Sequence, residues 1–189
     1  MDALKNFSGE ETEMPPMVPN IFLTGNSYRA SVYARAGMAY DYLHDFLGDS
    51  IFKTALKEYI KRWNGKHPIP YDFFYTFNDV VGEDLSWFWK PWFFDPGYAD
   101  LALDKVFTYE DSYEVFIKKV GALPVPIKLN ITYTDGTTSK MYKTAEVWKN
   151  GNNEYTVKLN REKDIKYITL GDDHILDVDS INNEVMIEK

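Results

Sequence analysis

The sequence predicts an α+β protein, in which an N-terminal antiparallel helical subdomain precedes an antiparallel β-sandwich of about seven strands. Apolar residues recur three and four positions apart before Pro96-Gly97 and at alternate positions after it. Turn residues separate the alternating segments at roughly 8–12-residue spacing, which is typical of a small sandwich. The change of period therefore marks both the fold class and its internal boundary.

Four helices are expected before the change of period. The apolar stripe of the first helix consists of Val32, Ala36, Ala39, Leu43 and Phe46. Gly48 suits the left-handed residue that ends this helix, and Gly82 has the same role after the third. Pro91 lies inside the fourth pattern and predicts a kink or a late first turn. Asn26 or Ser27 is expected to cap the first helix and Asp49 or Ser50 the second. "YDFFYTFNDVV" is expected to form the third helix, and the fourth opens at Asp84. Short loops between them favour antiparallel packing.

The strands are expected in seven alternating segments. "VPIKLNITYTDG" alternates apolar and polar residues and ends on Asp135-Gly136, a typical hairpin turn. The other six segments are "DLALDKVFTY", "SYEVFIKKVG", "TSKMYKTAEVW", "NEYTVKLN", "DIKYITLG" and "EVMIE". We expect residues 1–27 to form a loop or tail, 28–95 the helices and 96–189 the sandwich.

Composition excludes several classes of partner and site. The chain has 189 residues and a formal net charge of −8. This charge argues against a nucleic-acid backbone or an acidic membrane surface as partner, because both need clustered Lys and Arg. The absence of cysteine removes disulfides, thiolate metal sites and a cysteine nucleophile. No apolar run approaches the roughly 20 residues of a membrane span. The acidic, Pro-rich start suggests a piece of a longer protein, and its compartment stays undetermined.

The sequence offers few residues that could form a complete catalytic or metal site by themselves. The three histidines, His44, His67 and His174, show no metal spacing, and there is no H-E-x-x-H. We expect His67 and His174 in solvated loops and His44 packed or at the surface. Calcium is one interpretation of the Asp- and Asn-rich segment 172–183. That segment lacks the spacing of an EF-hand, and ordinary turn chemistry is the favoured interpretation.

Two aromatic features remain. "WFWKPWFF", from Trp87, could form a platform for a sugar or peptide, but its helical spacing favours core packing. Tyr33 lies beside the stripe of the first helix, where a tyrosine is normally a core residue with its hydroxyl at the rim. The residues around Tyr33 change that assessment.

From Tyr28 to Leu103 the chain resembles the C-terminal part of the M1 family of zinc aminopeptidases, gluzincins that include aminopeptidase N and leukotriene A4 hydrolase. "VYARAGMAYDYLHDFLGDSIF" is similar to the family's helix that carries a catalytic tyrosine, a basic residue two positions later and a small pair. Tyr33, Arg35 and Ala36-Gly37 fall on those positions, although Lys and Gly-Ala are commoner there. "LKEYIKRW", "KHPIPYDFFYTF" and "DLSWFWKPWFFDPGYADLAL" resemble the segments that follow, and "LDVDSINN" resembles the end of the sandwich in bacterial members.

The resemblance implies that the helices are the end of a thermolysin-like catalytic domain. Tyr33 would be the catalytic residue, donating a hydrogen bond to the oxyanion of a tetrahedral intermediate. Zinc would be the cofactor of the full-length parent, with its ligands and the G-A-M-E-N-type substrate loop upstream and none in this chain. The expected partners are a peptide substrate and the rest of the catalytic domain, and the isolated chain is expected to be inactive.

Arg35 lies about 200° around the helix from Tyr33, so we expect it in a structural ion pair before a substrate contact. The alternative to the peptidase is a non-catalytic M1-like or β-sandwich interaction module, in which Tyr33 is a core residue. The sequence leaves open the preferred N-terminal residue of the substrate and the oligomeric state.

Overall fold

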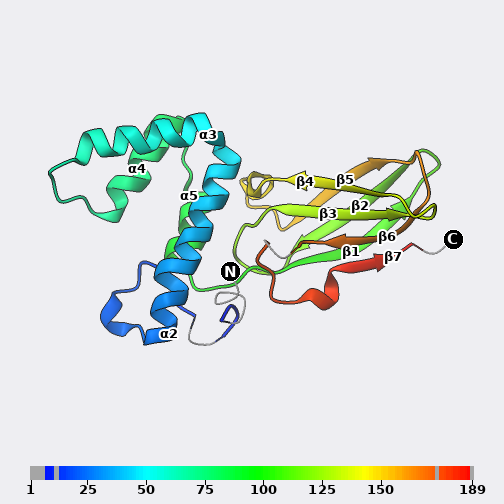
Figure 1. Ribbon diagram of the computed structural model, residues 1–189, viewed down its shortest axis with the longest axis horizontal. Helices are drawn as coiled ribbons and strands as arrows, with labels where there is room; N and C mark the ends of the chain where they lie inside the picture. The colour runs from blue at the N-terminus through cyan, green and yellow to red at the C-terminus, as the bar shows by residue number, and fades with distance from the viewer. Residues whose placement is uncertain (1–6, 11–12, 173–174, 188–189) are drawn as a thin grey trace.

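The computed structural model describes residues 7–10, 13–172 and 175–187, and the statements below concern these residues. Helical elements occupy the chain up to Phe94, and strands follow from Leu101, as the change of period predicts. The helical elements of this first part are η1 (Asn20–Phe22), α2 (Gly25–Tyr28), η2 (Arg29–Arg35), α3 (Ala36–Trp63), α4 (Pro70–Val81), α5 (Ser86–Trp89) and η3 (Lys90–Phe94), and two short 3-10 turns lie among the strands. In Figure 1 they form one side of the molecule and the strands form the other.

The first helix is continuous from α2 through η2 into α3, and α3 bends sharply in its middle (Figure 1). Gly48 lies at the bend with φ 73° and ψ 160°, a conformation that is nearly restricted to glycine. The predicted break between two helices is therefore present as a kink. The helix begins at Gly25, so the expected capping residues Asn26 and Ser27 both lie inside it, and Thr24 before it makes no side-chain cap.

Two features of α4 follow directly from its sequence. The backbone N–H of Ile69 donates to Asp72 at 2.8 Å, which satisfies a donor at the helix start, and Pro70 occupies the first turn. Gly82 ends the helix in the left-handed conformation, as expected. The rings of α4 pack against those of α5 and η3, with Phe74 and Trp89 centroids 4.9 Å apart. The aromatic run is thus mainly core.

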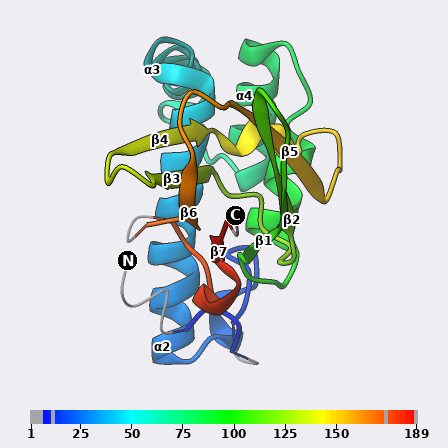
Figure 2. The same ribbon diagram turned by 90° about the vertical axis from the view of Figure 1, so that its right-hand side faces the viewer.

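Seven antiparallel strands form two sheets, which confirms the predicted α+β class. The strand order is β1-β2-β5 in one sheet and β4-β3-β6-β7 in the other, and neither sheet is closed (Figure 2). The strands are β1 (Leu101–Thr108), β2 (Ser112–Lys119), β3 (Ile127–Tyr133), β4 (Thr138–Lys143), β5 (Glu154–Asn160), β6 (Ile165–Leu170) and β7 (Glu184–Met186).

The β3–β4 hairpin turns at the predicted residues. Gly136 has φ 83°, and the carboxylate of Asp135 accepts a hydrogen bond from the Thr137 N–H at 2.9 Å. Lys163 and Thr137 together hold the pKa of Asp135 below its usual range. One segment is shorter than predicted: "TSKMYKTAEVW" is a strand only to Lys143. The 3-10 turn η4 (Ala145–Trp148) follows, because Trp148 turns inward and its Nε1 donates to the Val125 carbonyl at 2.9 Å.

Helices and sheets share one apolar core. Trp92 of η3 is fully buried and donates from Nε1 to the Pro124 carbonyl at 3.1 Å. Tyr142 of β4 donates to a carboxylate oxygen of Asp45 in α3 at 2.6 Å. Within the described part of the chain, no helix is both long and apolar enough to cross a membrane. The division into domains stays a prediction, because the core continues across the boundary.

Candidate functional site

The face of η2 that carries Tyr33 is the candidate site. η2 has π-type hydrogen bonding: the Ala36 N–H bonds to the Ser31 carbonyl, five residues back. Single π-type turns inside α-helices occur frequently at functional sites. Here the π-type segment contains both the exposed Tyr33 and the buried Arg35.

Tyr33 projects away from the core. Its side chain is 65 % exposed, and it lines a broad, open depression of about 820 Å³ together with Gly25, Tyr28, Arg29 and Ala34. The rings of Tyr28 and Tyr33 meet edge to face, with centroids 5.7 Å apart. A hydrogen bond between the two tyrosine side chains raises the pKa of Tyr28 above its ordinary value of 10. Tyr28 therefore stays a neutral phenol at pH 7, able to donate a hydrogen bond.

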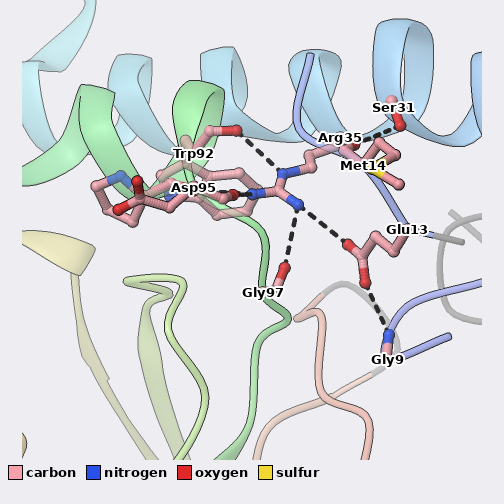
Figure 3. A network of polar contacts seen from close by, with 9 residues as sticks. Gly9, Glu13, Met14, Ser31, Arg35, Trp92, Asp95 and Gly97 are labelled. Atoms are coloured by element: carbon pink, nitrogen blue, oxygen red, sulfur yellow. Dashed lines mark hydrogen bonds and ion pairs between the residues drawn. The ribbon is translucent and has the colours of Figure 1, made fainter. Parts of the chain in front are cut away.

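Arg35, by contrast, is fully buried. Figure 3 shows its guanidinium facing Glu13 and the backbone of Gly97. Its Nη1 lies 3.3 Å from Oε1 of Glu13, so the predicted structural ion pair is present. The remaining hydrogen bonds of the guanidinium go to backbone carbonyls of the segment between Pro91 and Gly97. Burial lowers the pKa of Arg35 and raises that of Glu13, while the attraction between the two groups opposes both shifts.

Sequence reasoning missed the role of Glu13. This residue lies in the acidic, Pro-rich segment that the sequence analysis assigned to a loop or tail, yet it is buried and accepts the backbone N–H of Gly9 at 2.7 Å. The same segment is attached to the helices by Ser31 Oγ, which donates to the Met14 carbonyl at 2.5 Å. A glutamate in an acidic, Pro-rich segment gives no sequence signal of burial.

The remaining candidates lie elsewhere. His44 is at the surface, 3.2 Å from Asp49, and His67 is in an exposed loop, whereas His174 lies outside the described residues. The small pair Ala36-Gly37 makes no close approach, since a Cβ on Gly37 would meet nothing within 4 Å. No group of three or more His, Asp or Glu side chains in the described ranges could hold a metal ion.

The segment 172–183 shows turn chemistry where it is described, and Asp173 lies outside the described residues. Asp177 accepts the backbone N–H groups of Leu101 and Asp179 at 3.2 and 3.1 Å, and Asp179 accepts that of Ile181 at 2.9 Å. Burial raises the pKa of Asp177 to about 6. These carboxylates accept hydrogen bonds from backbone N–H groups. This is the turn chemistry that the sequence analysis favours for the segment.

Comparison with known proteins gives a fold likeness. No family model and no curated protein matches the chain. A solved structure of Legionella pneumophila aminopeptidase A, in complex with aspartic acid, is similar with a TM-score of 0.62 and 18% sequence identity. The match covers 88% of this chain and 19% of that one, so the chain spans about a fifth of the length of the aminopeptidase. At this identity the likeness establishes the fold and leaves the activity to be tested.

Proposed function

We propose that this chain is the C-terminal part of an M1-type zinc aminopeptidase and supplies the tyrosine that stabilises the transition state. The observation that carries the proposal is the orientation of Tyr33: an exposed phenol at an open depression, on a helix whose opposite face is anchored in the core. The fold likeness to an aminopeptidase and the resemblance around "VYARAG" support it.

In the proposed reaction this chain contributes a single hydrogen bond, which Tyr33 donates. In zinc peptidases, the bound metal polarises the scissile carbonyl and activates the attacking water. Tyr33 would donate its hydroxyl hydrogen to the oxyanion that develops on the carbonyl oxygen, and the phenol would keep its proton throughout. The described residues do not fit a zinc site, since they offer no cluster of three ligands. The proposal places the zinc ligands in polypeptide outside this chain.

The direct experiment is Tyr33→Phe in the longer polypeptide that contains this chain. Removing one oxyanion donor typically lowers kcat by about 10²–10³-fold, and we expect that loss with the fold unchanged. Tyr75→Phe is the matched control, because Tyr75 is exposed to a similar extent, 62 %, but lies on α4. Near-normal activity of Tyr33→Phe would assign the residue to packing and remove the proposed role.

The isolated chain provides a second test. Tyr33 without zinc has no oxyanion to stabilise, so we expect no stoichiometric zinc by elemental analysis and no turnover of an aminoacyl-anilide above background. Tight zinc at one ion per chain, or measurable turnover, would contradict the assignment of the metal ligands to another part of the protein.

A non-catalytic interaction module is the second candidate function. It is favoured by an exposed aromatic surface on α4, where Tyr71 and Tyr75 stack with centroids 6.2 Å apart. The coding sequence upstream of residue 1 separates the two candidates. An H-E-x-x-H with a glutamate roughly twenty residues later favours the peptidase. Its absence favours the module.

A further inference from the structure

Arg35 uses its whole hydrogen-bonding capacity inside the protein. A guanidinium has five N–H donors in a planar fork. Nε donates to the Trp92 carbonyl at 3.0 Å, and Nη2 donates to the carbonyls of Pro91 and Asp95 at 2.7 and 2.8 Å. Nη1 donates to the Gly97 carbonyl at 3.0 Å and to Glu13 at 3.3 Å. All five donors are matched, so the side chain has one geometry available to it (Figure 3).

The acceptors in this chain match an arginine better than the lysine that is commoner at this position in the M1 family. Four of them are carbonyls in and just after η3, where a helix end leaves carbonyl groups without intrahelical partners. A lysine carries three donors at a single point and cannot reach acceptors spread over residues 91–97. Glu13 supplies the negative charge that makes burial of the guanidinium tolerable.

The inner face of η2 is held at two positions, one on each side of Tyr33 in the sequence. Ser31 is bonded to the Met14 carbonyl and Arg35 to the η3 carbonyls, so the segment cannot rotate about its axis without breaking these contacts. The segment around Met14 is itself attached to η3, because the Met17 N–H donates to the Phe93 carbonyl at 3.0 Å. Tyr33, between the two anchors, is thereby forced outward.

We propose that Arg35, with Glu13 as its counter-ion, is a positioning residue that fixes the direction of the Tyr33 hydroxyl by locking η2 onto η3. The catalytic consequence rests on the proposed function of Tyr33, whereas the positioning itself is a property of this chain. The two parts can therefore be tested separately.

The positioning is tested on the isolated chain by NMR of tyrosine labelled with ¹³C at Cζ, with signals assigned through Tyr28→Phe and Tyr33→Phe. Arg35→Lys keeps the positive charge and removes the planar guanidinium with its five N–H donors. We expect the Tyr28 and Tyr33 signals to move and the pKa of Tyr28 to fall toward 10, because its contact with Tyr33 loosens. Glu13→Gln, a milder change, should move the same signals in the same direction and keeps the test available if Arg35→Lys fails to fold.

Val157→Ala is the matched control for general destabilisation. Val157 is buried in β5, away from η2, and its truncation lowers stability without touching the anchors. The control should leave both tyrosine signals and the Tyr28 pKa unchanged. If Arg35→Lys and Glu13→Gln also leave them unchanged while lowering Tm, Arg35 is a structural residue of the helix–sheet junction and the positioning role is wrong.

The catalytic consequence is tested in the longer polypeptide. Misplacement of a catalytic group by about 1 Å can cost about 10²-fold in rate. We expect Arg35→Lys to lower kcat by about 10–100-fold and to leave KM within about twofold. A KM-dominated loss would overturn the proposal. If the unaltered polypeptide has no peptidase activity, the proposed function fails, and the NMR result still decides whether Arg35 positions Tyr33.

Discussion

Trp92 and Trp87 show how one N–H group can decide how much a tryptophan contributes to the stability of the fold. Trp92 Nε1 donates to the Pro124 carbonyl, whereas Trp87 Nε1 is buried and has no hydrogen-bond partner among the described residues. Trp92→Phe leaves a buried carbonyl unsatisfied and should lower the free energy of unfolding by about 2–3 kcal/mol. Trp87→Phe removes the same atoms without that loss and should cost less than about 1 kcal/mol. Urea denaturation of both variants measures the difference, and equal losses would contradict the assigned role of the hydrogen bond.

Asp177 makes stability depend on pH in an unusual direction. Burial raises its pKa from 3.8 to about 6, so the folded protein favours the protonated acid. Its contribution is complete below about pH 4 and is lost as the pH rises through 6, by on the order of 2 kcal/mol. Urea midpoints measured from pH 4 to 7.5 should therefore fall more steeply than in Asp177→Asn. The exposed Asp79→Asn serves as control, and an unchanged slope in Asp177→Asn would remove this role.

The site residues differ in how far the sequence could predict them. Tyr33 and Arg35 stand in a recognisable pattern, and their opposite directions follow from helical spacing. Glu13 could not be predicted, because its burial depends on a contact with Arg35 across 22 positions of sequence. The buried positions of η2 are Ala30, Ser31 and Arg35, and a hydrophobic stripe does not detect the two polar ones. The predicted stripe accordingly places Val32 inward, where the structure has it half-buried.

At the scale of elements, the bend of α3 depends on glycine at one position. Gly48 adopts φ 73° and ψ 160°, where other residues are strained by about 1–3 kcal/mol. Gly48→Ala should therefore lower the free energy of unfolding by that amount. Gly37→Ala is the control in the same helix: its φ is helical, no atom crowds a new Cβ, and it should stabilise by about 0.5–1 kcal/mol. Chemical denaturation of both variants tests the contrast, and a neutral Gly48→Ala would show that the bend is not fixed by this residue.

Elements with a strong local signal were predictable and the π-type turns were not. Alternation identified all seven strands, and glycines marked the bend at Gly48 and the helix end at Gly82. The π-type segments η2 and η3 have 7 and 5 residues, which is too short for their different winding to appear as a period of apolar residues. They are fixed by tertiary contacts instead, since Arg35 bonds the carbonyls of η3. The apolar spacing in the sequence therefore predicts that a helix forms, but not whether its hydrogen bonds are of α-type or π-type.

At the scale of the molecule, the contacts between helices and sheets predict one cooperative unit. Tyr42 of α3 is buried, with its pKa raised to about 12, and its hydroxyl accepts the Leu176 N–H at 3.3 Å. Tyr142 and Trp92 make further bonds across the same junction. We expect a single calorimetric transition with equal calorimetric and van't Hoff enthalpies. Two transitions would instead support the separate domains that the change of sequence period predicts.

Separating the halves gives the stricter test of the same junction. A chain of residues 98–189 retains both sheets but loses Trp92, which bonds the Pro124 carbonyl in the intact protein. We therefore expect the flanking side chains Leu123 and Val125, both fully buried in the intact protein, to become exposed. The shortened chain loses the Trp92 and Tyr142 bonds, so its unfolding should begin at lower urea concentration and with a smaller m-value. Leu123→Ser in the shortened chain should then cost less than in the intact chain, because that side chain is already exposed to water. An equal cost in both chains would mean that the sheets bury Leu123 without help from the helices.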